Sequence, residues 1–390
     1  MSDYSSSDSK LNTENTLAEL DTSAIDRVLQ HAVTQGDVPA AVAAVGKRGG
    51  HVVVGAHGVT CLPAYRPAQS EADDYIVQAD TRFDVASLTK VVATLSSLTR
   101  LEQAGWLSFD DPVRRFFVNA GWFHTPSLGD VTIAELLSHQ SGLPAWRALF
   151  AVTNHRDTAL ANVLQSTLEH PGQLVYSDLG MILAGAIVEV ATGIRQDAFA
   201  SQLFAELGME STEYLPLINS PQARANIAAT EYCGWRRQLM WGDVHDENAW
   251  TLGGVSGHAG LFSTAADLAI YARAWLNLDE RLGRPELLKA CTQTVIEQHG
   301  KRQSYGWHLK HHGDNYAFAG EAASDTGFGH TGFTGTSMWL EPDQDWFAVL
   351  LTSRIHPSRF ASIQPLVSKD ISNLRSEFHL EAAKALRDSV

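Results

Sequence analysis

The pattern of apolar and polar positions predicts strands at both ends of the chain and helices between them. Small and β-branched residues from Pro39 to Gly58 surround the turn Arg48-Gly49-Gly50, which is typical of a hairpin. Strand-like segments return from Tyr305 onward, above all at 337–341 and 346–353. If the two ends share one antiparallel sheet, the fold class is α+β. Apolar residues at helical spacing predict helices at 23–36, 131–138, 157–170, 179–192, 263–276 and 365–390.

A further apolar segment follows the sequence FDVASLTK at residues 83–90. Residues 91–99 carry no charge, so the predicted helix is buried and Lys90 is its one unusual member. Burial lowers the pKa of a lysine unless an anion holds its charge. Ser87 precedes Lys90 by one helical turn, so the pair fits an acyl-transfer nucleophile with its amine. It equally fits a helix-capping serine followed by a lysine that reaches solvent, and Ser-x-x-Lys recurs at residues 7–10.

Two other stretches carry residues suited to chemistry. Residues 175–180 (VYSDLG) place Tyr176 and Asp178 just before a predicted helix, and the alternative interpretation is a helix cap with a packed tyrosine. In residues 328–336 (FGHTGFTGT), glycines alternate with polar residues ahead of a strand. Glycines there allow a ligand to approach the backbone, although a bulged edge strand has the same pattern.

Composition narrows the function classes. A chain of 390 residues with 44% hydrophobic and 19% charged residues is an ordinary globular protein, long enough for more than one lobe. The net charge of −15 argues against nucleic acid and anionic membranes as partners. Cys61, Cys233 and Cys291 fit no metal or redox spacing. With no signal-like N-terminus and no apolar run long enough to span a bilayer, we expect a cytoplasmic protein, and residues 1–22 are expected to be a disordered tail.

Taken together, the three stretches resemble a known family. Ser87–Lys90, Tyr176–Asp178 and His330–Gly332 occur in the order of the three motifs of serine β-lactamases and penicillin-binding proteins. The chain is most similar to the class C β-lactamase-like branch, which includes D-alanyl-D-alanine peptidases and esterases. The surrounding sequences LLSHQSGL at 136–143 and GHAGLFST at 257–264 extend the resemblance, which covers roughly residues 25–365.

The resemblance implies an architecture. We expect a five-stranded antiparallel sheet flanked by the N- and C-terminal helices, with a mainly helical lobe inserted. The sheet lobe would comprise residues 23–103 and 301–390, and the helical lobe residues 104–300. The active site would lie in the cleft between them.

The resemblance also implies roles for single residues. Ser87 would attack a carbonyl and form an acyl-enzyme, while Lys90 would take its proton or tune the base that does. Tyr176 would pass protons to the leaving group and later activate water. The backbone N–H groups of Ser87 and Phe333 would form the oxyanion hole. No cofactor and no metal are expected.

Asp178, His330, Thr331 and Gly332 are the predicted substrate-binding residues. Asp178 stands where the family commonly has Asn, and His330 where it commonly has Lys. Both changes make the pocket less favourable for the carboxylate of a penicillin or a D-Ala-D-Ala peptide. If Asp178 instead pairs with Lys90, it would keep that lysine charged and favour Tyr176 as the base.

The predicted substrate is therefore a small ester, amide or peptide. The favoured function is an esterase-like serine hydrolase with weak β-lactamase activity at most. A D-alanyl-D-alanine carboxypeptidase or β-lactamase is the alternative, and a non-catalytic penicillin-binding-like module is the second. The sequence gives no oligomeric state.

The remaining candidates are weaker. Residues 244–249 (VHDENA) with His258 offer metal-ligand types, but their spacing fits no zinc motif, and a loop beside the cleft is favoured. No Gly-x-Ser-x-Gly elbow, Walker loop or dinucleotide fingerprint occurs. Near a probable hairpin tip at 313–315, solvated histidines are expected at His308, His311 and His312. Core packing is the commoner role for tryptophans, although a substrate cleft could use Trp146, Trp235, Trp241 and Trp250.

Overall fold

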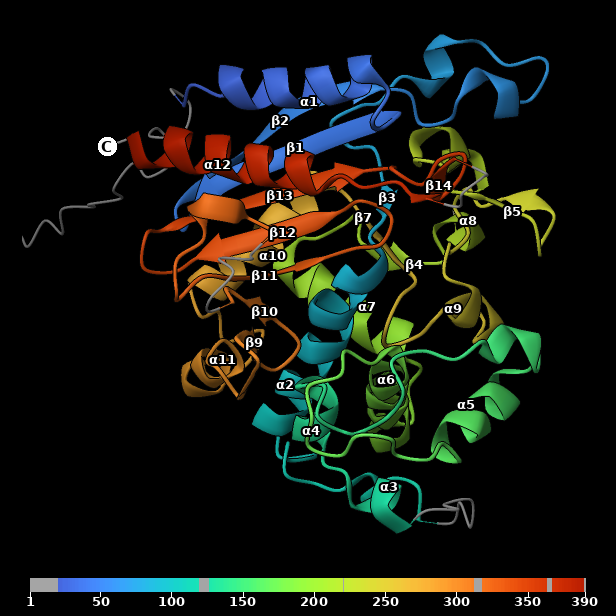
Figure 1. Ribbon diagram of the computed structural model, residues 1–390, viewed down its shortest axis with the longest axis vertical. Coiled ribbons are helices and arrows are strands. Elements are labelled where there is room, and N and C mark those ends of the chain that lie inside the picture. Colours follow the sequence, from blue (N-terminus) through green and yellow to red (C-terminus); the bar gives the residue numbers. More distant parts are fainter. Residues whose placement is uncertain (1–19, 119–125, 220, 312–317, 363–366, 389–390) are drawn as a thin grey trace, which may run out of the picture.

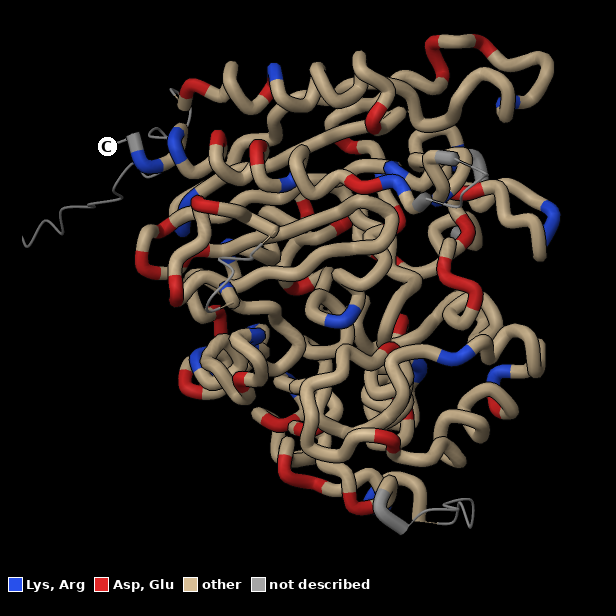
Figure 2. Tube along the Cα trace, in the orientation of Figure 1, with Lys and Arg blue, Asp and Glu red and all other residues tan. Residues whose placement is uncertain are grey.

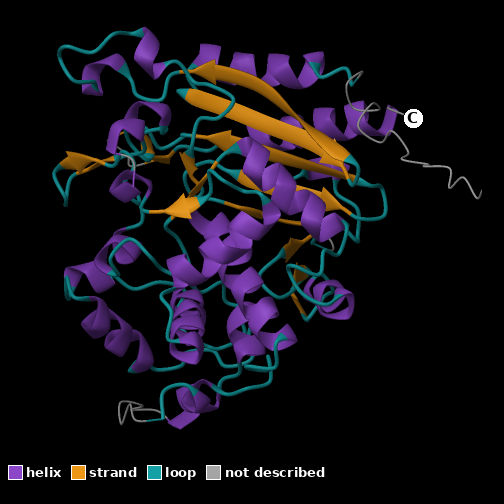
Figure 3. Cartoon of the chain, turned by 180° about the vertical axis from the view of Figure 1, so that it is seen from behind, coloured by secondary structure: helices purple, strands orange, loops and turns teal. Residues whose placement is uncertain are grey.

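The computed structural model describes residues 20–118, 126–219, 221–311, 318–362 and 367–388. Strands gather in one half of the molecule and helices fill the other (Figures 1 and 3). The α+β class expected from the sequence is therefore confirmed. Within the described ranges, no helix has the length and apolarity needed to cross a membrane.

The main sheet is antiparallel and has eight strands among the described residues, so the expectation of five is wrong. Strands β8, β9 and β10 extend the sheet beyond β11, and they contain only two or three residues each, several of them charged. Such segments have no apolar alternation to reveal them. The spatial order is β2 (Gly50–Gly58), β1 (Ala40–Lys47), β13 (Trp346–Thr352), β12 (Ser337–Glu341), β11 (Phe328–Thr331), β10 (His308–Leu309), β9 (Lys301–Gln303) and β8 (Ile296–Gln298).

Helices cover both faces of this sheet. On one face, α1 (Ser23–Gln35) and α12 (Ser372–Asp388) pack side by side against β1, β2 and β13 (Figure 1). On the other face lies α10 (Ala265–Leu276), which belongs to the middle of the sequence. Strand β1 alternates accordingly, with Val42 and Ala44 in one core and Ala43 and Val45 in the other.

The remaining elements are short helices and small sheets. The helices are α2 (Ser96–Gln103), α3 (Pro126–Asp130), α4 (Ile133–Leu137), α5 (Arg156–Leu164), α6 (Asp178–Thr192), α7 (Gln196–Leu207), α8 (Pro216–Asn219), α9 (Glu247–Thr251) and α11 (Pro285–Cys291). The small sheets are β3 (Phe83–Asp84) with β7 (Leu261–Ser263) and β4 (Glu213–Tyr214), β5 (Tyr232–Cys233) with β6 (Gln238–Leu239), and β14 (Phe360–Ser362) with β15 (Val367–Ser368).

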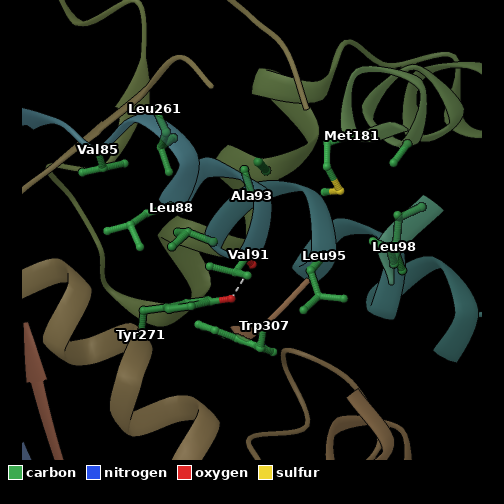
Figure 4. Close-up of a cluster of buried hydrophobic side chains, with 14 of the residues drawn as sticks. Val85, Leu88, Val91, Ala93, Leu95, Leu98, Met181, Leu261, Tyr271 and Trp307 are labelled. Atoms are coloured by element: carbon green, nitrogen blue, oxygen red, sulfur yellow. Dashed lines mark hydrogen bonds between the residues drawn. The ribbon is translucent and has the colours of Figure 1, made fainter. Parts of the chain in front are cut away.

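The segment after Ser87 is buried at the centre of the molecule, as its apolar sequence predicted. It begins as a π-helical turn over Lys90–Leu95 and continues as α2. A π-helical turn leaves carbonyls without their usual α-helical partners. The Tyr271 hydroxyl donates to the Val91 carbonyl at 2.6 Å, so the irregular turn is satisfied from α10 (Figure 4).

Charged residues are spread over the described surface. Figure 2 shows Lys and Arg scattered among Asp and Glu rather than aligned in a stripe. This arrangement agrees with the sequence, whose net charge of −15 disfavours a phosphate backbone as partner.

Candidate active site

Ser87 lies in a single 3₁₀ turn, Ala86–Leu88, between β3 and the π-helical turn. Ala86 has φ of +47°, a left-handed conformation that a residue with a Cβ seldom adopts. The buried Asp84 carboxylate holds this turn by accepting the N–H groups of Ala86 and His245, each at 2.8 Å. Burial raises the pKa of Asp84, while these two donors oppose that change. The turn that carries Ser87 is thus fixed by a carboxylate that sequence reasoning missed.

The loop after β11 holds the same turn from the other side. Thr334 and Thr336 donate their hydroxyls to the carbonyls of Asp84 and Val85, at 2.7 and 3.1 Å. The first and third motifs are therefore joined by direct hydrogen bonds although about 250 residues separate them. The order of the motifs in the sequence gave no indication of these hydrogen bonds.

Lys90 is fully buried, and its ammonium lies among several oxygen atoms. Its Nζ lies 2.8 Å from the Ser87 Oγ, 3.0 Å from the His258 carbonyl and 2.8 Å from Asp178 Oδ1. Burial by itself would lower the pKa of Lys90, but Asp178 and Tyr176 together outweigh it and the pKa is raised. Lys90 and Asp178 thus form an ion pair whose lysine is fully buried. The structure thus shows the alternative in which Asp178 keeps the lysine charged.

The His258 carbonyl reaches Lys90 because its neighbour Gly257 passes directly against α6. A Cβ at Gly257 would lie 2.1 Å from the Met181 carbonyl, so no other residue fits without a shift of the backbone. The His258 ring is held by Ser256 Oγ and Asp246 Oδ1, both at 2.8 Å. His258 therefore positions Lys90 through its backbone, and its ring is occupied elsewhere.

Tyr176 completes the group around the serine. Its hydroxyl is hydrogen-bonded to Lys90 and to Ser87, and its ring centroid lies 5.0 Å from Lys90 Nζ. Burial raises the pKa of Tyr176, so the resting side chain is a neutral phenol. Ser177 caps α6 by accepting the Gly180 N–H at 3.1 Å. The capping interpretation of this motif is thus correct for Ser177, while its two neighbours face Lys90.

Three histidine rings surround Tyr176. The ring centroids of His139, His308 and His330 lie 4.5, 5.6 and 6.0 Å from that of Tyr176. Burial and the nearby Lys90 charge lower the pKa of all three, to about 4 for His308. They are therefore neutral at pH 7. His308 is half-buried and lines the pocket rather than lying free in solvent, because pairing of β10 with β11 stacks its ring on that of His330, with centroids 4.4 Å apart. The expected hairpin tip and His312 lie outside the described residues.

A pocket of about 480 Å³ opens beside Ser87. Tyr176, Thr331, Gly332 and Phe333 line it, whereas His330 lies buried behind it. Among the described lining residues there is no acid. Sequence reasoning missed the pocket's basic side chains because they come from segments far apart in the chain: Lys301, Arg302, Arg354 and Arg375.

Phe333 forms the rim of this pocket, with 43% of its surface exposed. Its ring stacks on His245 with centroids 5.6 Å apart, and the Arg354 guanidinium lies 4.9 Å from the ring centroid. Arg354 also donates to the Phe333 carbonyl at 2.8 Å, and Arg375 donates to the Gly332 carbonyl at 2.9 Å. Side chains thus fix the backbone that would offer the second oxyanion N–H.

Residues 244–249, expected to form a loop, end in the first turn of α9 and are held by internal contacts. His245 is paired with Glu231 at 2.9 Å, and the buried Asn248 donates to the Arg147 carbonyl at 2.8 Å. No group of three or more potential metal ligands occurs among the described residues.

The four tryptophans considered above divide in two. Trp241 is buried, so the predicted role in core packing is correct for this residue. For the other three the prediction is wrong, because the exposed fraction is 49% for Trp146, 47% for Trp235 and 37% for Trp250.

Comparisons with known proteins identify the family and the fold. The family model described as Beta-lactamase matches residues 25–369. The chain belongs to the β-lactamase family. It is 31% identical over 306 residues to a putative D-alanyl-D-alanine carboxypeptidase of Escherichia coli (strain K12), covering 71% of this chain and 70% of that protein. It is 30% identical over 363 residues to the N-acetylmuramyl-L-alanine amidase of Bacillus subtilis (strain 168), covering 85% and 80%.

A solved structure shows the same fold. The class C β-lactamase of Rhodobacter sphaeroides superposes with a TM-score of 0.67 at 18% identity, covering 92% of this chain and 98% of that one. The fold is thus that of β-lactamases, and the family consists of serine hydrolases. The resemblance drawn from the three motifs is confirmed.

Proposed function

We propose that this serine hydrolase cleaves a small ester through an acyl-Ser87 intermediate, as a carboxylesterase-like member of its family. One observation carries the proposal. The Ser87 hydroxyl, the Lys90 ammonium and the Tyr176 hydroxyl form one hydrogen-bonded group at the wall of a pocket. A serine beside a charged amine and a phenol is an activated nucleophile with a proton shuttle.

The Lys90–Asp178 ion pair determines which side chain acts as the base. Because Asp178 keeps Lys90 charged, the base is Tyr176 once the Lys90–Tyr176 pair has lost one proton. Tyr176 takes the serine proton as Oγ bonds to the carbonyl carbon, and then gives that proton to the departing alkoxide. Tyr176 next deprotonates the water that attacks the acyl ester, and its proton returns to Ser87. The N–H groups of Ser87 and Phe333 receive the developing oxyanion.

A D-alanyl-D-alanine carboxypeptidase is the second candidate. The four basic side chains that line the pocket favour a substrate carboxylate, and Lys90 offsets the Asp178 charge that would repel it. The similar Escherichia coli protein bears this name. Against it stands His330, a neutral ring where the motif commonly has a cation.

Comparison of three substrates separates the candidates. We expect kcat/KM for a short-chain nitrophenyl ester to exceed that for benzylpenicillin and for a D-Ala-D-Ala peptide by at least about tenfold, equivalent to about 1.4 kcal/mol. Hydrolysis by Lys301→Ala provides the control, because Lys301 is another basic residue that lines the pocket. If this lysine recognises the substrate carboxylate, the variant loses activity selectively on the peptide and penicillin. Faster turnover of the peptide than of the ester would contradict the esterase proposal and put the carboxypeptidase first.

The Lys90–Asp178 pair predicts a specific pH dependence. Activity should rise with pH, because the Lys90–Tyr176 pair must lose a proton before Tyr176 can act as base. In Asp178→Asn the nearest anion is gone, so the pKa values of both Lys90 and Tyr176 fall and the rising limb of kcat/KM moves to lower pH. We expect a move of about one pH unit or more.

Asp178→Glu is the matched control for this measurement. It retains the negative charge, so its rising limb should stay near that of the wild type. Ester hydrolysis followed from pH 5 to 10 distinguishes the variants. An unmoved limb in Asp178→Asn would show that this pair does not set the protonation of the base.

A further inference from the structure

Four aromatic side chains form an exposed patch that the proposed reaction does not use. We call Trp146, Phe150, Trp235 and Trp250 the aromatic cluster. The Phe150 ring links the patch, with its centroid 6.2 Å from Trp146 and 4.9 Å from Trp235. Trp235 and Trp250 meet edge to face at 5.5 Å and 86°. Three of these rings are indoles that are 37–49% exposed, and a contiguous apolar patch of this kind marks a binding surface.

The aromatic cluster stands on the two segments that hold Lys90. Trp146 directly follows Ala145, whose carbonyl accepts the Asp178 N–H at 2.9 Å. Trp250 lies in α9, whose N-cap Asp246 holds the His258 ring at 2.8 Å. The first connection ends at Asp178 and the second at His258, and both of these residues contact Lys90 Nζ. The aromatic cluster is thus connected to the reacting groups through these two segments, although none of its four rings lines the Ser87 pocket. A substrate that reaches Ser87 would have to extend beyond that pocket to contact the cluster.

Internal hydrogen bonds keep the patch in place. The buried Asn248 amide accepts the Phe150 N–H at 3.3 Å and donates to the Arg147 carbonyl at 2.8 Å. The Arg236 guanidinium, which donates to the Val244 carbonyl at 3.1 Å, lies 5.8 Å from the Trp250 ring centroid. Because the rings are already positioned, a ligand would not have to order them on binding.

The exposure of the rings points to the chemistry of the ligand. A ligand that stacks on half-exposed indoles has one face against the rings and the other face in water. It therefore needs one flat apolar face and polar groups around its edge. A sugar ring has this form, and indole N–H groups can donate to its hydroxyls. A nucleobase has a similar form, but the net charge of −15 disfavours the phosphates that accompany it.

We propose that the aromatic cluster binds a saccharide ring carried by the substrate. This identification of the substrate class rests on the proposed hydrolysis at Ser87. Saccharide binding itself requires only the aromatic cluster, so the two proposals can fail separately.

Direct binding tests the inference. The disaccharide of N-acetylglucosamine would be titrated into the full chain, with intrinsic tryptophan fluorescence and calorimetry as readouts. We expect saturable binding to the wild type and to Ser87→Ala, and at least about tenfold weaker binding to Trp235→Ala and Trp250→Ala, since each substitution removes an aromatic face on which the sugar ring would stack. Loss of hydrolysis in Ser87→Ala with binding retained separates this result from the catalytic proposal.

Trp106→Ala is the matched control, because Trp106 is 54% exposed and lies outside the aromatic cluster. It should bind the disaccharide like the wild type. Trp235 lies in the turn between β5 and β6, so Trp235→Ala keeps the test valid if Trp250→Ala fails to fold. The inference is overturned if the disaccharide does not bind, if Trp106→Ala weakens binding equally, or if benzyl alcohol or lipid vesicles bind in place of the saccharide.

Discussion

Ser87→Ala is expected to reduce kcat for ester hydrolysis by about 10³-fold or more, because no other hydroxyl can form the acyl-enzyme at this position. The folded state should change little. The Ser87 hydroxyl is partly exposed, and the turn is held by Asp84, Thr334 and Thr336 rather than by Ser87 itself. Initial rates and thermal unfolding of the same preparations provide the measurement.

Ser7→Ala is the natural control for this variant. Residues 7–10 repeat the Ser-x-x-Lys spacing in a polar part of the chain, so a role that depended on spacing alone would apply to both serines. We expect Ser7→Ala to retain full activity. Retention of more than about a tenth of the activity by Ser87→Ala would remove Ser87 from the reaction.

Lys90→Met is expected to lower kcat by about 10²- to 10⁴-fold, because it removes the charge that stabilises the Tyr176 phenolate and the serine alkoxide. It should also destabilise the protein. Removing one partner of a buried ion pair typically costs about 3–5 kcal/mol, and the lower end applies here because Asp178 keeps a fifth of its side chain exposed.

A double variant separates these two effects. In Lys90→Met with Asp178→Asn, no buried charge is left without its partner, so most of the lost stability should return while the activity stays low. Denaturant unfolding and ester hydrolysis would be measured on both variants. Recovery of activity together with stability would mean that Lys90 supports the fold and takes no part in the chemistry.

Much of the site could be predicted because its chemistry is local in sequence. The spacing of Ser87 and Lys90 places them on one turn, and the apolar residues that follow predict burial of the lysine. Tyr176 and Asp178 flank one capping serine, so a single short motif brings both to Lys90. The roles of these residues remain predictions until variants are assayed.

What could not be predicted comes from tertiary structure. Asp84 and the threonines after β11 act through hydrogen bonds between distant segments, which no local pattern encodes. Strand β10 has two residues, and its pairing with β11 turns His308 from an expected surface histidine into a neighbour of Tyr176. The basic side chains of the pocket come from segments far apart in the chain, so the motifs that contain Asp178 and His330 gave no indication of them.

Tryptophan positions illustrate a different limit. An indole is compatible with a core and with a binding surface, so composition could not separate Trp241 from Trp235. Only the packing of the surrounding segments shows that one is buried and the other exposed.

The acyl-Ser87 intermediate is the central claim, and intact mass after exposure to a short-chain nitrophenyl ester tests it most directly. The wild type, quenched in acid during turnover, should gain the mass of one acyl group, located by peptide mapping on the segment that contains Ser87, and Ser87→Ala should gain none. Turnover by the wild type with no adduct, or with the acyl group on another residue, would contradict the account.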